Sequence, residues 1–256
     1  MRRRLCVWLP FIAAALSVAL PAAADFPDTI GRIKPSIVAV GTYKATNSPP
    51  FTFRGTGFAV GDGNLVATNA HVLPVDNVTK DGPLELVVMS QLNGQARIRP
   101  VSVAAVSPEH DLALLRLEEG TVPPMTLNGA EKVREGQSVA YTGFPIGGAL
   151  GFSPVTHRGM ISAITPIALP SPTAQQLNAK SIRRLKAGPF NIYQLDGTAY
   201  PGNSGSPVFD FDTGNVIGII NMVYVKGTRE SAISQPTGIT YAIPSTFLRE
   251  LLDSVR

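Results

Sequence analysis

The sequence is poor in the side chains that hold metals and disulfides. One cysteine, one tryptophan and three histidines occur among 256 residues, and only 16% of the residues are charged. With so few potential ligands, we expect no metal site and no cofactor. The chain instead holds 24 glycines and 22 prolines, which break long helices and argue against a helical bundle or a coiled coil. The length fits one large or two small domains.

Residues 1–24 have the features of a secretory signal peptide. Three arginines at 2–4 precede an apolar stretch that runs to about Leu20, and alanines at 22–24 supply a small-residue cleavage site. The apolar stretch is short for a membrane span, and an uncleaved anchor is the alternative interpretation. We therefore expect a periplasmic or secreted protein whose mature chain begins at Asp25.

Signal cleavage would change both the charge and the cysteine content. Removing three arginines from the 22 basic residues leaves 19 against 18 acidic ones. A balance this close to zero gives no reason to expect binding to nucleic acid or stable association with a membrane. Cys6 also lies in the signal, so the mature protein would have no disulfide and would depend on its core for stability.

Short β-rich runs punctuated by Gly, Pro, Asn or Asp dominate the remaining chain. We expect strands at 36–43, 57–60, 65–68, 84–89, 111–117, 138–142, 215–225 and 238–242. Many short strands at turn-like spacing favour a barrel or a sandwich, and a linker between residues 118 and 136 would divide them into two halves. Apolar periodicity predicts a helix over 245–255 and a basic helix over 174–186, for which a solvated face is the plain interpretation.

A serine flanked by glycines lies in the segment Gly202-Asn203-Ser204-Gly205. A serine hydroxyl is a weak nucleophile and needs a neighbouring base. Glycine reaches backbone angles that turn N–H groups inward, so the amides of Gly202 and Ser204 are candidate donors to a developing oxyanion. Many ordinary turns share this tetrad, so alone it is a weak signal.

Imidazole is the side chain best suited to act as a base near neutral pH. His71 ends a strand-like run, and Asp111 opens an apolar run, where a shielded carboxylate can hold a histidine tautomer. A strand-end cap is the alternative role for Asp111. We expect His110 at the surface and His157 in a turn with a structural role. The order His, Asp, Ser differs from the Ser, acid, His order of α/β-hydrolases.

With these residues in this order, the chain resembles trypsin-like serine proteases, closest to the HtrA/Deg branch. The matching segments are 55–73, 109–117, 136–145, 155–163, 193–208, 215–220 and 238–245. The resemblance implies an all-β, chymotrypsin-like fold of two six-stranded antiparallel β-barrels with a C-terminal helix. It divides the chain into a signal peptide (1–24), an N-terminal barrel (25–122) and a C-terminal barrel with the terminal helix (123–256).

The resemblance also implies an activity and roles for the site residues. His71 would be the general base, Asp111 the orienting acid and Ser204 the nucleophile that forms an acyl-enzyme, with the amides of Gly202 and Ser204 as the oxyanion hole. The implied substrates are unfolded or flexible protein or peptide segments, and assembly into a homo-oligomer stays open. The alternative is a catalytically quiet binding or chaperone-like module that retains the protease fold.

The chain departs from the family pattern at several positions. Only eleven residues follow Ser245, so no PDZ domain is expected. Asn203 stands where digestive relatives have an aspartate, which argues against activation by zymogen cleavage, and Ser206 replaces a usual glycine. The expected substrate pocket contains no acid or base, which favours small or medium apolar side chains. Its residues are Thr198, Ala199, Tyr200, Ile220, Asn221, Met222 and Val223.

Overall fold

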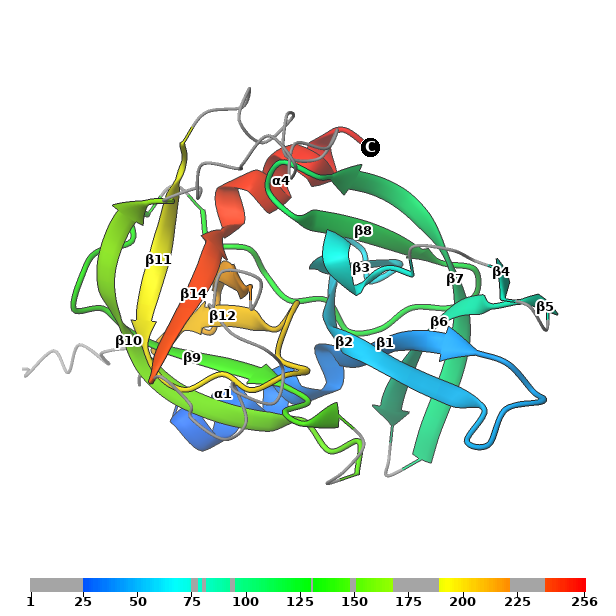
Figure 1. Ribbon diagram of the computed structural model, residues 1–256. Coiled ribbons are helices and arrows are strands. Elements are labelled where there is room, and N and C mark those ends of the chain that lie inside the picture. The colour runs from blue at the N-terminus through cyan, green and yellow to red at the C-terminus, as the bar shows by residue number, and fades with distance from the viewer. Residues whose placement is uncertain are drawn as a thin grey trace, which may run out of the picture.

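Two closed barrels of antiparallel strands form the body of the protein (Figure 1). The computed structural model describes residues 25–74, 78–79, 82–92, 95–129, 131–147, 151–167, 189–221 and 238–256. Each barrel has six strands, and a helix follows the last of them, which confirms the predicted fold. The expected signal peptide (1–24) and the expected basic helix (174–186) lie outside the described residues, so both stay predictions.

The first barrel joins strands in the order β1-β2-β3-β8-β7-β6. Their bounds are β1 (Ile37–Tyr43), β2 (Phe51–Val60), β3 (Leu65–Asn69), β6 (Glu85–Leu92), β7 (Gln95–Ser107) and β8 (Leu112–Leu117), and a separate small sheet pairs β4 (Val78–Thr79) with β5 (Gly82–Pro83). Strand β7 escaped the sequence prediction because most of its side chains are exposed or half-buried and give no clear apolar alternation.

The second barrel joins strands in the order β10-β11-β14-β13-β12-β9. Their bounds are β9 (Ser138–Gly143), β10 (Val155–Pro166), β11 (Asn191–Asp196), β12 (Pro207–Asp210), β13 (Val216–Ile220) and β14 (Ile239–Pro244). The expectation that His157 lies in a turn is wrong, because it lies within β10 and pairs with Tyr141 of β9. The long pairing of β10 with β9 and β11 overrides the local glycine and proline signals around it.

Two helices lie outside the barrels. Helix α4 (Ser245–Asp253) begins directly after Pro244, buries Leu248 and Leu252, and confirms the predicted C-terminal helix. Helix α1 (Phe26–Ile33) was not predicted, because its proline-containing start gave little helical signal. It has a proline in its first turn, where a missing N–H costs nothing, and Phe26 stacks on Phe211 of the second barrel at 4.0 Å.

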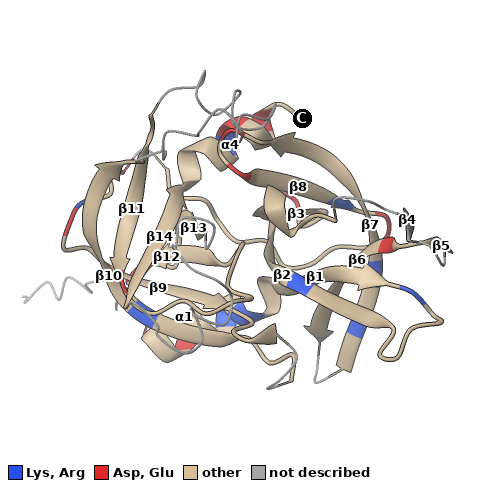
Figure 2. Cartoon of the chain, in the orientation of Figure 1, with Lys and Arg blue, Asp and Glu red and all other residues tan. Residues whose placement is uncertain are grey.

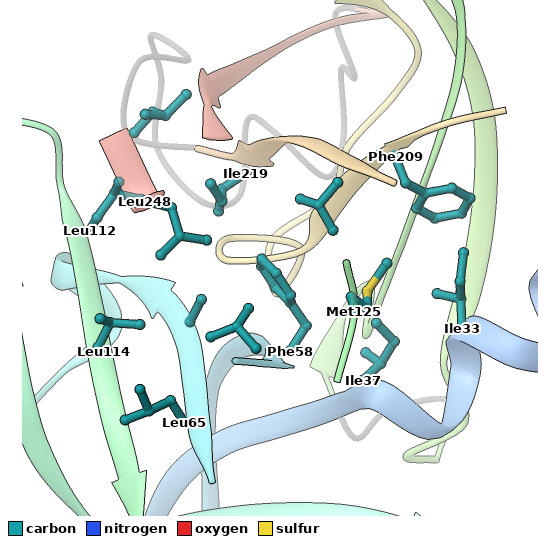
Figure 3. Close-up of a cluster of buried hydrophobic side chains, with 14 of the residues drawn as sticks. Ile33, Ile37, Phe58, Leu65, Leu112, Leu114, Met125, Phe209, Ile219 and Leu248 are labelled. Carbon is teal, nitrogen blue, oxygen red and sulfur yellow. The ribbon is translucent and has the colours of Figure 1, made fainter. Parts of the chain in front are cut away.

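One apolar cluster joins the barrels (Figure 3). Phe58 and Leu114 come from the first barrel, Phe209 and Ile219 from the second, and Leu248 from α4. The segment between the barrels is also bound to both of them. Its amides at Met125 and Asn128 donate to Ala59 of β2 at 2.9 Å and to Val216 of β13 at 2.8 Å. The predicted boundary at 122/123 falls in this segment and stays a prediction.

In the view of Figure 2, basic and acidic residues of the described chain lie at scattered positions along the ribbons of both barrels. None of the helices in the described ranges has the length and apolar character needed to cross a bilayer.

Candidate active site

The side chains of His71 and Asp111 meet at one end of the first barrel. His71 lies in the 3₁₀ turn η2 (Ala70–Val72) after β3, and Asp111 directly precedes β8, the strand paired with β3. Nδ1 of His71 is 2.6 Å from Oδ2 of Asp111, and the amide of His71 donates to Oδ1 at 3.0 Å. Asp111 is fully buried, whereas the His71 side chain is 24% exposed. A buried carboxylate on Nδ1 holds the imidazole with Nε2 available to a reaction partner.

Asp111 is held from both barrels. Its carbonyl oxygen accepts hydrogen bonds from Asn69 Nδ2 at 3.1 Å and from the Ala70 amide at 3.0 Å. Its Oδ2 accepts a hydrogen bond from Asn221 Nδ2 at 2.8 Å, across the boundary between the barrels. These contacts stabilise a backbone with φ of +55°, which costs a residue with a Cβ about 1–2 kcal/mol. The aspartate is therefore fixed in its direction toward His71.

Ser204 lies in the turn that precedes β12, and Thr56 of β2 holds this turn. The Thr56 amide donates to the Ser204 carbonyl at 2.9 Å, and Thr56 Oγ1 donates to the Gly202 carbonyl at 2.8 Å. The same hydroxyl accepts a hydrogen bond from the Phe144 amide at 3.1 Å. A strand of the first barrel thus orders a turn of the second.

The amides of the turn divide into two groups. The N–H groups of Asn203, Gly205 and Ser206 donate to backbone carbonyls, at 2.9, 3.0 and 2.9 Å. Within the described chain, the N–H groups of Gly202 and Ser204 have no acceptor. Backbone donors left unpaired are uncommon in folded proteins, so these two groups are available to an oxygen atom of a ligand.

The glycines around Ser204 are required by this geometry. Gly202 has φ of +106° and Gly205 has φ of +88°, which side chains rarely allow. A Cβ at Gly202 would collide with the carbonyl oxygen of Phe144, and one at Gly205 would collide with that of Thr56. The sequence argument that glycine lets the turn fold inward therefore agrees with the observed backbone.

The structure brings His71, Asp111 and Ser204 into one region, but not all three are joined by hydrogen bonds. Among the described residues, the Ser204 hydroxyl forms no hydrogen bond with His71. Gly55 of β2 lies between the two segments, where a side-chain carbon would be 2.7 Å from Val72 Cγ2 and 3.0 Å from the Ser204 carbonyl oxygen. Catalytic hydrogen bonds are often long before substrate binds, so this arrangement is compatible with a reactive pair.

The expected pocket residues fall into different environments. Thr198 and Tyr200 are half-buried, whereas Ala199 and Ile220 lie in the core of the second barrel. The Thr198 carbonyl accepts a hydrogen bond from the Tyr141 hydroxyl at 2.6 Å, and burial raises the pKa of that tyrosine. The side chain of Asn221 contacts Asp111, a role that its position next to a strand did not reveal. Met222 and Val223 lie outside the described residues.

The other two histidines are packed against aromatic rings. His110 was expected at the surface, which is wrong: its ring stacks on Phe247 of α4 at 3.9 Å, and burial lowers its pKa. Strand alternation could not show that a helix from the far end of the chain covers this side chain. His157 stacks on Tyr141 at 5.1 Å, and burial lowers its pKa as well. In the described ranges, no three His, Cys, Asp or Glu side chains gather in a metal-binding arrangement.

Comparison with known proteins identifies the family of the chain. The family model described as "Trypsin-like peptidase domain" matches residues 55–219, and the chain belongs to this family. Two curated proteins called "Probable periplasmic serine endoprotease DegP-like", from Marinomonas sp. and Halomonas elongata, are each 31% identical to it over 202 residues. Each alignment covers 79% of this chain and 35% of the relative, so the chain spans about a third of their length.

A solved structure shows the same fold. The HtrA-type protease AlgW with a tripeptide matches with a TM-score of 0.62 at 24% sequence identity, covering 90% of this chain and 63% of that chain. The two curated relatives are named DegP-like, and this structural neighbour is named an HtrA-type protease.

Proposed function

We propose that the protein is an exported serine endopeptidase, with Ser204 as the nucleophile, His71 as the general base and Asp111 as the acid that orients it. The observation that carries the proposal is a pair of backbone amides, those of Gly202 and of the buried Ser204 itself. Neither amide has an acceptor within the described chain. Serine hydrolases need such a pair of donors for the negative oxygen of the tetrahedral intermediate.

The proposed reaction gives each of these groups one role. As Ser204 Oγ bonds to the carbonyl carbon of the substrate, its proton passes to His71 Nε2, and the carbonyl oxygen takes the negative charge. The amides of Gly202 and Ser204 donate to that oxygen. The carbon–nitrogen bond then breaks, and the proton on Nε2 passes to the leaving amine. Water repeats these steps on the acyl-enzyme and releases the free enzyme.

The proposed substrates are unfolded or flexible protein segments, since a chain must be extended to enter a site between two rigid barrels. The half-buried Thr198 and Tyr200 bring no charge to the proposed pocket for the residue before the scissile bond, which favours small or medium apolar side chains. Export fits the signal-like residues 1–24 and the periplasmic names of the relatives.

A fluorophosphonate probe tests the assignment of the nucleophile. We expect the mature protein to be labelled and to cleave unfolded casein, and we expect Ser204→Ala to lose both properties. His71→Ala should lower kcat/KM by about 10⁴-fold or more, by analogy with other triads. Ser254→Ala, which changes an exposed serine after α4, is the matched control and should be labelled like the wild type. Near-full peptidase activity in His71→Ala would contradict the role of the base.

One observation favours a second candidate function. Because the Ser204 hydroxyl forms no hydrogen bond with His71 within the described chain, the protein could retain the fold as a catalytically quiet module that binds unfolded segments. The probe separates the two candidates. A folded wild-type protein that binds casein without being labelled supports the binding module, whereas labelling that depends on Ser204 supports the enzyme.

A further inference from the structure

Arg54 of β2 lies beside the candidate active site with part of its hydrogen-bonding capacity unused. Its Nε donates to the Val72 carbonyl at 2.5 Å, and its Nη2 donates to the Leu73 carbonyl at 2.9 Å. A guanidinium group has five N–H donors, so further donors remain. No acidic side chain in the described ranges forms an ion pair with Arg54, although the residue is exposed.

The two carbonyl hydrogen bonds fix the guanidinium in place. Val72 and Leu73 directly follow His71, so Arg54 is anchored to the segment that carries the candidate base. An arginine that is already held needs to lose little side-chain entropy when it binds a ligand, and its planar fork matches the two oxygens of a carboxylate.

The position of Arg54 relative to Ser204 defines which part of a substrate it can reach. Gly55, the next residue, lies between Val72 and the Ser204 carbonyl, so Arg54 stands on the first-barrel side of the site. The proposed pocket for the acyl half of the substrate, residues 198–200, belongs to the second barrel. If the acyl half binds there, we infer that the leaving half of an extended substrate crosses the first barrel, where β2 and η2 meet.

Apolar side chains from both barrels lie near the turn of Ser204. Phe53 directly precedes Arg54 in β2, and a Cβ at Gly202 would be 3.1 Å from the Phe53 ring. Ile146 is 38% exposed, although it is a large apolar residue, and its amide donates to the Pro201 carbonyl at 2.7 Å. Ile146 also has φ of +59°, an unfavourable backbone conformation for a β-branched residue. Apolar surface and one anchored cation thus lie together beside the turn of Ser204.

We propose that Arg54 binds a substrate carboxylate on the leaving-group side of the scissile bond. The carboxylate would belong to an acidic side chain or to the C-terminus of the substrate, and the two sources offer the same chemistry to the guanidinium. This inference rests on the proposed endopeptidase function and adds a preference that the apolar pocket on the second barrel does not supply.

Matched peptides test the preference. A sequence taken from an unbiased cleavage profile of the mature protein is made with Asp or Asn at each of the first three positions after the scissile bond. Two further peptides are truncated so that Asn at the tested position is their last residue. The third form has a free C-terminal carboxylate, and the fourth has a C-terminal amide. We expect kcat/KM to be about tenfold higher for Asp than for Asn at one of these positions, as for a charge-assisted hydrogen bond, and the preference to shrink as salt is added. The third and fourth forms show whether a C-terminal carboxylate is recognised as well.

The variants separate recognition from positioning. In Arg54→Gln the Asp-to-Asn ratio should fall to about one, whatever happens to the overall rate. Arg54→Lys should keep part of the ratio, because it keeps the charge without the fork. Arg116→Gln, which removes an exposed arginine from β8, should keep the full ratio. A ratio that stays the same in Arg54→Gln while both rates fall would show that Arg54 only positions His71, and would overturn the proposal.

A binding measurement keeps the two proposals distinguishable. Labelled Asp and Asn peptides are titrated into the Ser204→Ala variant, which should bind the Asp peptide more tightly. This difference should disappear in the double variant that carries both Ser204→Ala and Arg54→Gln. If the wild type cleaves no peptide, the proposed enzyme function fails, and the binding difference alone decides on Arg54. Cleavage without any acidic preference, or equal binding of both peptides, overturns the carboxylate proposal and leaves the enzyme function intact.

Discussion

The backbone amide of Thr56 in the first barrel donates to the carbonyl oxygen of Ser204 in the second barrel at 2.9 Å. The Thr56 side chain adds a hydrogen bond to the Gly202 carbonyl, and its own carbonyl accepts one from Thr68 Oγ1 at 2.8 Å. These hydrogen bonds hold the backbone around the candidate nucleophile against strand β2 of the first barrel. The spacing between base and nucleophile depends on this contact between barrels.

Replacing Thr56 with valine should therefore impair both the site and the fold. Thr56→Val keeps the shape and the backbone hydrogen bond but removes the side-chain bonds to Gly202 and Phe144. We expect kcat/KM to fall by about 10- to 100-fold and the free energy of unfolding to fall by about 1–3 kcal/mol, the cost of unpaired buried groups. Thr52→Val, at an exposed position of the same strand, should change neither. Peptidase kinetics and urea unfolding measure both, and equal effects of the two variants would contradict the role of Thr56.

Asn221 should act through Asp111. Asn221→Ala removes the hydrogen bond to Oδ2 and leaves a buried carboxylate with one donor fewer. We expect kcat/KM to fall by about 10- to 100-fold, mainly through kcat, because a hydrogen bond to a charged group contributes about 1.5–3 kcal/mol. Asn221→Ser should restore part of the activity if its hydroxyl reaches the carboxylate. Asn191→Ala, at an exposed position of β11, is the control. A change in KM alone would instead indicate that Asn221 belongs to the substrate pocket.

Gly202 should tolerate no side chain. Gly202→Ala places a Cβ against the Phe144 carbonyl at a positive φ, so the turn must change and its amide must move. Loss of one oxyanion donor lowers kcat by about 10²- to 10³-fold in other hydrolases, and we expect a loss of that size. Gly120 also has a positive φ, of +67°, but open space around it, so Gly120→Ala should cost stability without affecting kcat. An active Gly202→Ala would argue against this amide as a donor.

His157 should make the stability of the protein depend on pH. Burial lowers its pKa in the folded state, so below about pH 6.5 the unfolded chain binds the proton more readily. Stability should therefore be retained above this pH and fall as the pH decreases toward 5. His157→Phe keeps the stacking on Tyr141 and removes the titration, so the decrease in Tm between pH 7.5 and 5.5 should become smaller. An unchanged decrease would assign the effect to other groups, of which His110 is the first to examine.

The sequence predicted the segments of the site because each one has a local signature. Glycines lie on both sides of Ser204, Asp111 precedes an apolar strand, and His71 follows another. The pairing of these two strands is enough to bring Asp111 to His71. The contacts of Arg54 and Asn221 left no such signature, because each joins residues that are distant in sequence. The same reason explains why His110 was misplaced, since the ring that covers it belongs to a helix more than a hundred residues later.

A protease that acts on extended chains, as we propose for this protein, is also exposed to aggregation with them. Exposed strand margins are templates on which such chains can anneal and aggregate. In the described structure, the sheets of both barrels close on themselves, so that each of their strands has a neighbouring strand on either side. Over its described residues, neither barrel therefore offers an edge strand to which an extended chain could add by backbone pairing.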